Sequence, residues 1–259
     1  MPAVPIALTI AGSDSGGGAG LQADLKAFLR FGAFGTTVVT ALTAQNTLGV
    51  RAVHPAPAAF VRAQFAALAE DLPPAAVKSG MLADAALVAL VAEELRARRW
   101  APYVLDPVML ATSGDRLLAA DAEAAVRERL LPLATLVTPN LDEAALLVGF
   151  PVTDEASMRR AGQALLALGA RAALVKGGHL PGDRLVDVLV TRAEARAFAH
   201  DRIVTRAGHG TGCTLSAAIT AGLARGRPLA TAVEDALAYV QRGLREAPGL
   251  GAGAGPLAH

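Results

Sequence analysis

The segment Gly208–Cys213, with the order Gly-His-Gly-Thr-Gly-Cys, has the residue types and spacing of an anion-binding loop. It runs directly into the apolar segment Thr214–Ile219, which is typical of a buried helix. A glycine-rich turn at a helix start presents free backbone N–H groups at the positive end of the helix dipole, and this arrangement holds a phosphate. Cys213, the only cysteine, would stand in the first helical turn, where we expect a lowered thiol pKa. The segment indicates phosphoryl transfer; the alternative is an ordinary glycine-rich loop before a core helix with a buried cysteine.

Short apolar runs alternate with longer amphipathic segments along the chain, as strands alternate with helices. Strands buried on both faces and separated by helices predict an α/β fold, a three-layer α/β/α sandwich with a mainly parallel central sheet. No repeat or linker divides the sequence, so we expect residues 1–259 to form a single domain. The expected strands are Pro5–Ala11, Thr36–Leu42, Ala76–Ser79, Tyr103–Leu105, Leu136–Thr138, Ala172–Val175 and Val186–Thr191. The expected helices are Ala19–Arg30, Ala58–Glu70, Asp84–Arg99, Asp121–Leu131, Leu141–Val148, Glu155–Leu168, Gly212–Ala224 and Leu229–Leu244.

Polar and glycine-rich segments follow nearly every expected strand. Ligands of parallel α/β sheets gather where strands end and helices begin, so these segments predict an active site at one edge of one sheet. The segments are Ala11–Gly20, Ala44–Thr47, Lys78–Leu82, Asp106–Met109, Ser113–Asp115, Thr138–Glu143 and Lys176–His179.

Composition and missing motifs exclude several classes of protein. The net charge of +1 gives no reason to expect nucleic acid or an acidic membrane as a partner. One cysteine excludes a disulfide framework, no secretory signal is visible, and no apolar run is long enough for a membrane span, so we expect a cytoplasmic protein. The sequence also lacks a Walker P-loop, a Rossmann fingerprint, a metalloprotease helix motif and a nucleophile elbow.

Lysine is rare in this arginine-rich chain, in which Lys26, Lys78 and Lys176 are the only lysines among 24 basic residues. A GC-rich genome would replace lysine by arginine wherever the physics allows. The surviving lysines are therefore favoured at sites that need a compact point charge.

Together, these segments resemble the ribokinase-type small-molecule kinases, and within them the hydroxymethylpyrimidine/phosphomethylpyrimidine kinases of thiamin biosynthesis. The resemblance is nearly end to end, although Thr112, Ala254 and Ala258 stand where the family often has basic or polar residues. Its segments are Leu8–Ser15, Gly17–Lys26, Thr40–Thr47, Asp106–Met109, Thr138–Asn140, Lys176–His179, His209–Thr214 and the closing segment Gly253–His259. The glycine-rich tail Gly249–Gly255 is either a mobile end or a loop over a site.

The resemblance implies ATP- and Mg²⁺-dependent phosphorylation of 4-amino-5-hydroxymethyl-2-methylpyrimidine, first to the monophosphate and then to the diphosphate. It also implies a homodimer with a small-molecule substrate. Two alternatives stay open, a pyridoxal/pyridoxine kinase of the same fold and a non-catalytic ligand-binding relative. The charged residues named below argue against the second.

For the substrate, the resemblance implies that Gln45 reads the aminopyrimidine ring, because a side-chain amide offers a donor and an acceptor side by side. The alternative is a buried amide at a strand end. Gly12 and Asp24 are further expected contacts, with a solvated helix acid as the alternative for Asp24. Met81 and Val108 are expected to wall the ring, although such residues also serve as plain core.

For the phosphates, the resemblance implies that Asp106 and Glu143 lie around Mg²⁺, with stabilisation of a helix start as the alternative for Glu143. Lys176 would neutralise the transferring phosphoryl group, and Asn140 would contact the nucleotide. The N–H groups of Gly210, Thr211 and Gly212 would stabilise the charge that develops on phosphoryl oxygens, with Gly210 also contacting the nucleotide.

Cys213 would face the substrate hydroxymethyl group and accept its proton as a thiolate. The second acceptor is a phosphate oxygen, which is largely ionised at neutral pH and needs no base. Loss of Cys213 should therefore slow the first phosphorylation more than the second. His179 and His209 are expected to be hydrogen-bonded scaffold residues rather than catalysts.

Overall fold

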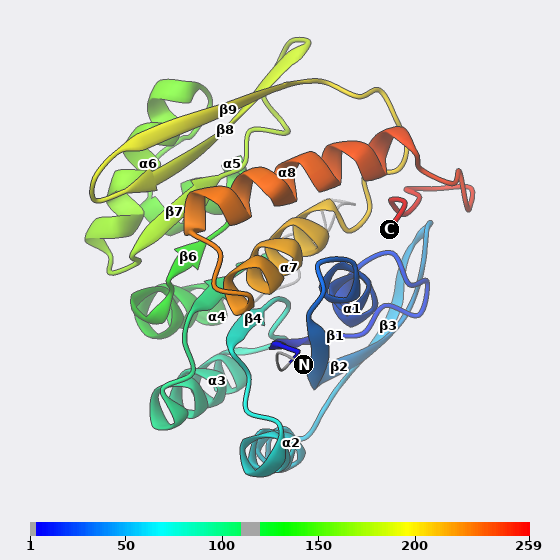
Figure 1. Cartoon of the computed structure of the whole chain (residues 1–259), viewed down its shortest axis with the longest axis vertical. Helices are drawn as coiled ribbons and strands as arrows, with labels where there is room; N and C mark the ends of the chain where they lie inside the picture. The colour runs from blue at the N-terminus through cyan, green and yellow to red at the C-terminus, as the bar shows by residue number, and fades with distance from the viewer. Residues whose placement is uncertain (1–3, 110–119) are drawn as a thin grey trace.

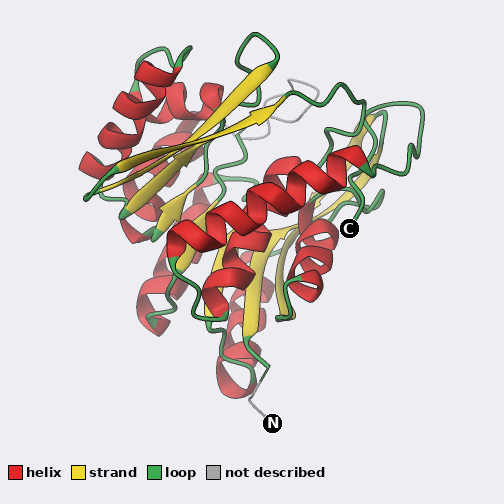
Figure 2. Cartoon of the chain, turned by 45° about the horizontal axis from the view of Figure 1, so that its top comes forward, coloured by secondary structure: helices red, strands yellow, loops and turns green. Residues whose placement is uncertain are grey.

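The computed structural model describes residues 4–109 and 120–259, and it is built around one twisted sheet between two layers of helices (Figures 1 and 2). The strand order is β3-β2-β1-β4-β5-β6-β7-β8-β9. Neighbouring strands from β2 through β1 to β7 are parallel, whereas β3, β8 and β9 are added antiparallel at the two ends. The strands are β1 (Ile6–Gly12), β2 (Phe34–Asn46), β3 (Gly49–Pro55), β4 (Ala76–Ser79), β5 (Tyr103–Leu105), β6 (Leu136–Val137), β7 (Ala172–Val175), β8 (Arg184–Thr191) and β9 (Ala195–Asp201).

The helices divide between the two faces of the sheet. One layer contains α1 (Gly20–Arg30), α7 (Thr211–Ala224) and α8 (Leu229–Arg245). The other contains α2 (Ala58–Asp71), α3 (Ala85–Arg98), α4 (Ala120–Ala125), a π-helical turn (Val126–Leu130), a 3-10 turn (Leu131–Leu133), α5 (Leu141–Val148) and α6 (Glu155–Ala167). None of the helices in the described part of the chain is long and apolar enough to cross a membrane.

Alternate residues of the buried strands pack on opposite faces of the sheet, in two separate hydrophobic clusters. In β5, Tyr103 and Leu105 pack with the α2–α6 layer, while Val104 packs with the α1, α7 and α8 layer. The same alternation separates Leu136 from Val137 in β6. Strands that are apolar on both faces need helices on both sides, and this confirms the predicted three-layer α/β/α fold with a mainly parallel sheet.

The structure corrects the expected strands in two places. The strands β3 and β9 were not predicted. Their side chains are mostly exposed, so these two strands lack the apolar run that identifies a buried strand. The predicted end of β2 at Leu42 was also wrong, because the strand continues as a hairpin arm to Asn46. Gln45 therefore lies inside a strand rather than in a loop after one. Thr112 and the segment Ser113–Asp115 lie outside the described residues.

Candidate active site

The glycine-rich segment forms the N-terminus of α7, as the sequence predicted. Gly210 is the N-cap residue and adopts φ 81°, a left-handed conformation that favours glycine. A Cβ atom at this position would overlap the carbonyl oxygen of Gly18, so the two glycine-rich loops meet at a contact only glycine permits. The first N–H groups of α7 have no partner within the helix and carry its positive dipole end, which makes this turn an anion site.

Lys176 and Asp106 lie directly beside this turn. The Lys176 Nζ is 3.5 Å from Asp106 Oδ1, and it is 3.1 Å from the position that a Cβ on Gly212 would take. The other oxygen of Asp106 accepts a hydrogen bond of 3.0 Å from Ser216 on α7. Burial disfavours the ammonium, but Asp106 and Glu143 outweigh it and raise the pKa of Lys176. A fixed cation therefore stands beside the predicted phosphate cradle.

Glu143 and Asn140 form a capping box at the start of α5. The Asn140 side chain accepts from the Glu143 N–H at 2.9 Å, and Glu143 accepts from the Asn140 N–H at 2.8 Å and the Met109 N–H at 3.3 Å. The helix-start alternative for Glu143 is thus observed. Burial raises the pKa of Glu143, although Lys176 acts in the opposite direction.

The acidic pair fits Mg²⁺ only with additional ligands. No cluster of three or more metal-binding side chains occurs among the described residues. Mg²⁺ commonly takes one or two carboxylates and completes its shell with water and phosphate oxygens. Asp106 and Glu143 could supply the carboxylates, with Glu143 better suited to an indirect contact because both its oxygens already accept backbone hydrogen bonds.

The expectation of a lowered thiol pKa at Cys213 is wrong. Burial raises the pKa of Cys213 to about 11, with Asp24 and Asp106 adding to the increase and Lys78 opposing it. Burial and the two carboxylates therefore outweigh the positive end of the α7 dipole, and this favours the protonated thiol of Cys213 at neutral pH.

A buried ion pair lies underneath Cys213. Lys78 on β4 and Asp24 on α1 are fully buried and bonded to each other, while the other oxygen of Asp24 accepts from the Thr9 hydroxyl at 2.6 Å. Burial raises the pKa of Asp24, although Lys78 and the Thr9 hydrogen bond act in the opposite direction. Burial also disfavours the charged form of Lys78, but Asp24, Cys213 and Asp106 outweigh it and raise the pKa of Lys78. Asp24 is therefore not a solvated acid. A direct contact of Asp24 with a substrate ring stays a prediction, and the enclosure of its carboxylate weighs against it.

The residues that are expected to wall the ring follow three strand ends, and their contact with a ring stays a prediction. Gly12 ends β1 against Met81, whose Cε would lie 2.6 Å from a Cβ on Gly12. Val108 follows Asp106 with φ 24°, a strained conformation for a β-branched residue. Both Met81 and Val108 remain partly exposed, unlike plain core residues.

Asp14, which the sequence analysis did not single out, is linked through His209 to the predicted site residue Gln45. Its carboxylate accepts hydrogen bonds from the N–H groups of Gly16, Gly18 and Ala19 and from His209 Nε2, at 2.8 to 3.0 Å. Burial would raise its pKa, but these bonds, with His209 first, lower the pKa of Asp14. An Asp two residues before glycine is a known turn signal and could have identified it.

His209 is a hydrogen-bonded scaffold residue, as expected. It joins Asp14 to Gln45, and its backbone N–H donates to Gly255 in the C-terminal tail at 3.2 Å. The tail also donates from Ala254 to the carbonyl of Thr47 in the β2–β3 turn. Of the two alternatives for the tail, the structure supports a segment laid over the site.

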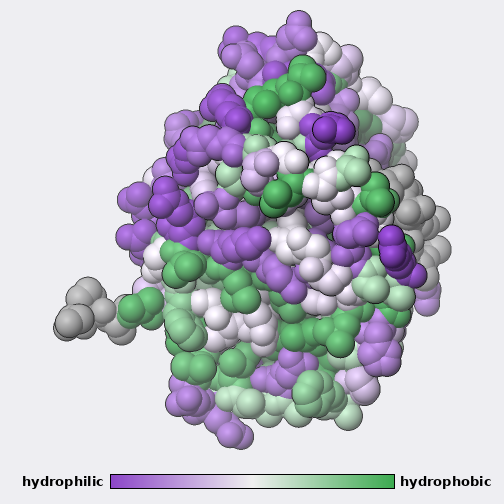
Figure 3. All heavy atoms as spheres, turned by 90° about the vertical axis from the view of Figure 1, so that its right-hand side faces the viewer, coloured by the Kyte–Doolittle hydropathy of each residue, from purple (hydrophilic) through white to green (hydrophobic). Residues whose placement is uncertain are grey.

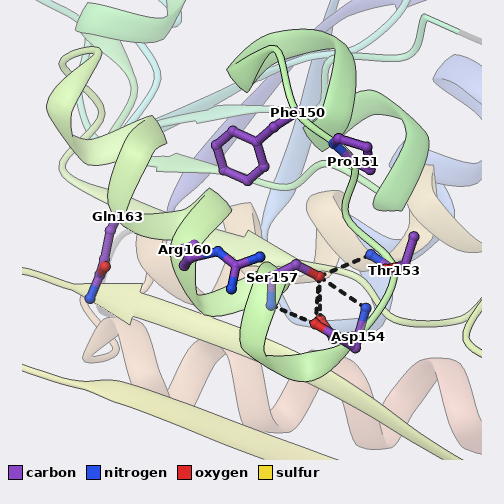
Figure 4. A pocket seen from close by; sticks show the side chains of 7 residues that line it. All are labelled: Phe150, Pro151, Thr153, Asp154, Ser157, Arg160 and Gln163. Atoms are coloured by element: carbon purple, nitrogen blue, oxygen red, sulfur yellow. Dashed lines mark hydrogen bonds between the residues drawn. The ribbon is translucent and has the colours of Figure 1, made fainter.

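A separate hollow of about 700 Å³ is lined by α6 and the loop that precedes it, and it contains none of the predicted site residues (Figure 4). Asp154 and Ser157 in its wall are bonded to each other in the capping box of α6. Its lining is Phe150, Pro151, Thr153, Asp154, Ser157, Arg160 and Gln163.

The fold and the site together define the class of protein, a small-molecule kinase of ribokinase-like fold. The structure of Bacillus subtilis pyridoxal kinase in complex with ADP superimposes with a TM-score of 0.93 at 36% identity, over 99% of this chain and 98% of that one. Phosphomethylpyrimidine kinase from Clostridium difficile superimposes with a TM-score of 0.83 at 40% identity, over 92% and 98%.

Within this class, the chain belongs to the phosphomethylpyrimidine kinase family, whose profile matches residues 14–258. It is 52% identical over 257 residues to the hydroxymethylpyrimidine/phosphomethylpyrimidine kinase of Rhizobium meliloti, covering 98% of this chain and 96% of that protein. It is 50% identical over 255 residues to the protein of the same name from Streptomyces coelicolor, covering 98% and 94%. The predicted family is confirmed.

Proposed function

We propose that this chain, acting as one domain over residues 1–259, transfers the γ-phosphoryl group of ATP to 4-amino-5-hydroxymethyl-2-methylpyrimidine and then to the resulting monophosphate. The observation that carries the proposal is the position of Lys176 Nζ, 3.5 Å from Asp106 and over the Gly212 turn of α7. A fixed cation and unpartnered N–H groups at one point match the charge that a transferring phosphoryl group develops. Structural neighbours in complex with ADP and AMP-PCP support ATP as the donor.

In the first step the hydroxymethyl oxygen forms a bond to the γ-phosphorus, the bond to ADP breaks with its electron pair going to ADP, and the alcohol proton passes to the small thiolate fraction of Cys213. Lys176 and the Gly210–Cys213 N–H groups hold the phosphoryl oxygens, while Asn140 lies at the adjoining strand end to orient the nucleotide. Mg²⁺, supported by Asp106 and Glu143, would neutralise phosphate charge. Because phosphoryl transfer is dominated by positioning and charge neutralisation, a neutral Cys213 thiol is compatible with turnover.

The experiment supplies purified protein with ATP, Mg²⁺ and the aminopyrimidine, with pyridoxal in a parallel reaction, and separates the products by chromatography. Sequential formation of mono- and diphosphate is the expected result. Phosphate on pyridoxal alone would assign the chain to vitamin B6 chemistry, a candidate favoured by the pyridoxal kinase neighbours. No product in either reaction would support a non-catalytic role. A reaction in which chelation of Mg²⁺ leaves turnover unchanged would refute the metal assignment.

We also propose that two copies associate through the β2–β3 edge of the sheet, in the cytoplasm. Large apolar side chains are exposed on these strands and beside them, including Phe34 (55%), Leu48 (68%) and Phe60 (62%). Apolar side chains gather on the lower half of the face that contains this edge (Figure 3). Sedimentation analysis should give a dimer, and Leu48→Glu with Val53→Glu should give a monomer; a wild-type monomer would refute the proposal.

A further inference from the structure

Four side chains from three separate segments form a chain of polar contacts at the edge of the expected substrate site. His209 Nε2 lies 2.9 Å from Asp14 Oδ2 and 3.2 Å from the amide atom of Gln45 that the structure places as Nε2. The Gln45 atom placed as Oε1 lies 3.4 Å from Thr43 Oγ1. Gln45, the residue that is expected to read the substrate ring, therefore lies inside this chain, between His209 and Thr43.

The Asp14 end of this chain fixes the proton on His209. Asp14 already accepts three backbone N–H hydrogen bonds, which is the environment of an ionised carboxylate. A carboxylate is acceptor-only, so the imidazole Nε2 must carry a hydrogen to bond with it. The same nitrogen cannot then accept a hydrogen bond from an amide NH₂ group.

Thr43 determines which atom of the Gln45 side-chain amide can face it. The Thr43 hydroxyl has a single hydrogen, and it donates this hydrogen to the Ser13 carbonyl oxygen at 2.9 Å. Toward Gln45 the hydroxyl is therefore an acceptor. Both neighbours therefore favour one orientation, in which the Gln45 oxygen faces His209 and the Gln45 NH₂ group faces Thr43. This is the placed amide rotated by 180°, a change that interchanges Oε1 and Nε2 and leaves the other atoms in position.

The backbone of Gln45 is immobilised as well. Its N–H donates to Ser15 Oγ at 2.8 Å, and the Ser15 hydroxyl donates to the Gln45 carbonyl at 2.6 Å. Because its backbone and its amide are both held, the Gln45 side chain presents one N–H donor and one oxygen lone pair to a substrate ring, always in the same spatial order. A ring of the opposite donor and acceptor order would leave these groups unpaired.

We propose that His209, held by Asp14, is a positioning residue that sets the order of donor and acceptor which Gln45 presents, and that it thereby selects a 4-aminopyrimidine over its 4-oxo counterpart. The inference rests on the proposed function. A 4-aminopyrimidine offers a ring-nitrogen acceptor beside an exocyclic N–H donor. The 4-oxo analogue offers a ring N–H donor beside an oxygen acceptor, the reverse order.

The test compares kcat/KM for the 4-amino substrate and for 4-oxo-5-hydroxymethyl-2-methylpyrimidine. Wild-type protein should favour the amino substrate by about 100-fold or more, since unpaired buried polar groups discriminate strongly. His209→Leu frees the amide to rotate and should lower this ratio at least tenfold. His209→Gln places an N–H donor at a similar reach and should retain the ratio within about threefold. Thr43→Val removes the contact at the opposite end of the Gln45 amide and leaves the anion-binding loop intact. This variant should also lower the ratio of the two kcat/KM values.

A purely structural role for His209 predicts a different result, because it would lower kcat/KM for both substrates equally and leave their ratio unchanged. That outcome, or a wild-type enzyme that does not discriminate, overturns the proposal. ¹⁵N NMR of the histidine-labelled protein provides a readout without turnover: Nε2 of His209 should be protonated, and an Nδ1–H tautomer with bare Nε2 also overturns it. If wild-type protein phosphorylates neither pyrimidine, the proposed function fails, and the tautomer alone decides the orientation of Gln45.

Discussion

The pH dependence of the two phosphorylation steps tests the assignment of Cys213. With a pKa of about 11, the thiolate is present in only ~0.03% of molecules at pH 7.5. This fraction increases about tenfold for each pH unit until the pH approaches the pKa. If the thiolate accepts the alcohol proton, kcat/KM for the first phosphorylation should therefore rise about tenfold per unit between pH 7 and pH 9.

The second phosphorylation provides an internal control in the same protein. Its acceptor phosphate has a second pKa of about 6 and is already ionised over this range, so its rate should be nearly constant. Cys213→Ala should abolish the slope of the first step and slow it more than the second. Cys213→Ser keeps a polar side chain of similar size. Its kcat/KM for the first phosphorylation should be as independent of pH as that of Cys213→Ala.

The assay follows monophosphate and diphosphate formation separately, each from its own purified acceptor, with Mg²⁺ and ATP saturating at every pH. A first step that is flat in wild-type protein, or equal losses in both steps for Cys213→Ala, would refute the reasoning. Cys213 would then be a positioning residue, and the alcohol proton would leave by another route.

Three further predictions follow from contacts around the site. Lys176→Met should lower kcat for both steps by about 10²–10³-fold, as expected for loss of one group that stabilises transition-state charge. A variant with the same kcat as the wild-type protein would refute the role of Lys176 in phosphoryl transfer. Lys78→Met leaves the Asp24 carboxylate buried and unpaired, which should cost about 3–5 kcal/mol of unfolding free energy in urea denaturation. The double variant Lys78→Met with Asp24→Leu should regain most of that stability, whereas additive losses would contradict the pairing. Gly210→Ala should lower kcat/KM and thermal stability together because its Cβ overlaps the Gly18 carbonyl, and an unchanged enzyme would show that the loop contact is dispensable.

The layers of the fold were predictable because their physical signal is local. A strand such as Tyr103–Leu105 is apolar on both faces, and this marks a buried parallel strand between two helical layers. The exposed strands β3 and β9 carry no such signal, since they are stabilised by pairing with β2 and β8 rather than by burial. Their existence depends on a neighbouring strand that the local sequence does not specify.

The arrangement of the candidate site was only partly predictable for a related reason. The loop at Gly210 and the capping pair Asn140–Glu143 have short-range signatures, and the structure contains both. The pKa of Cys213 depends instead on Asp24, Asp106 and the degree of burial, which come from distant parts of the chain. A rule that considers only the helix N-terminus therefore gave the wrong sign.

The position of the buried Lys78–Asp24 pair gives the site its particular electrostatics. A lysine alone at this position would lower the pKa of the Cys213 thiol, whereas the Asp24 carboxylate acts in the opposite direction and pairs with the Lys78 charge. Lys176 lies instead at the Gly212 turn of α7, 3.5 Å from Asp106, so its charge faces the predicted phosphate cradle. This suits a kinase whose acceptor is first a neutral alcohol and then a phosphate, because the charge of Lys78 is already paired and the cation that faces the transferred group is Lys176.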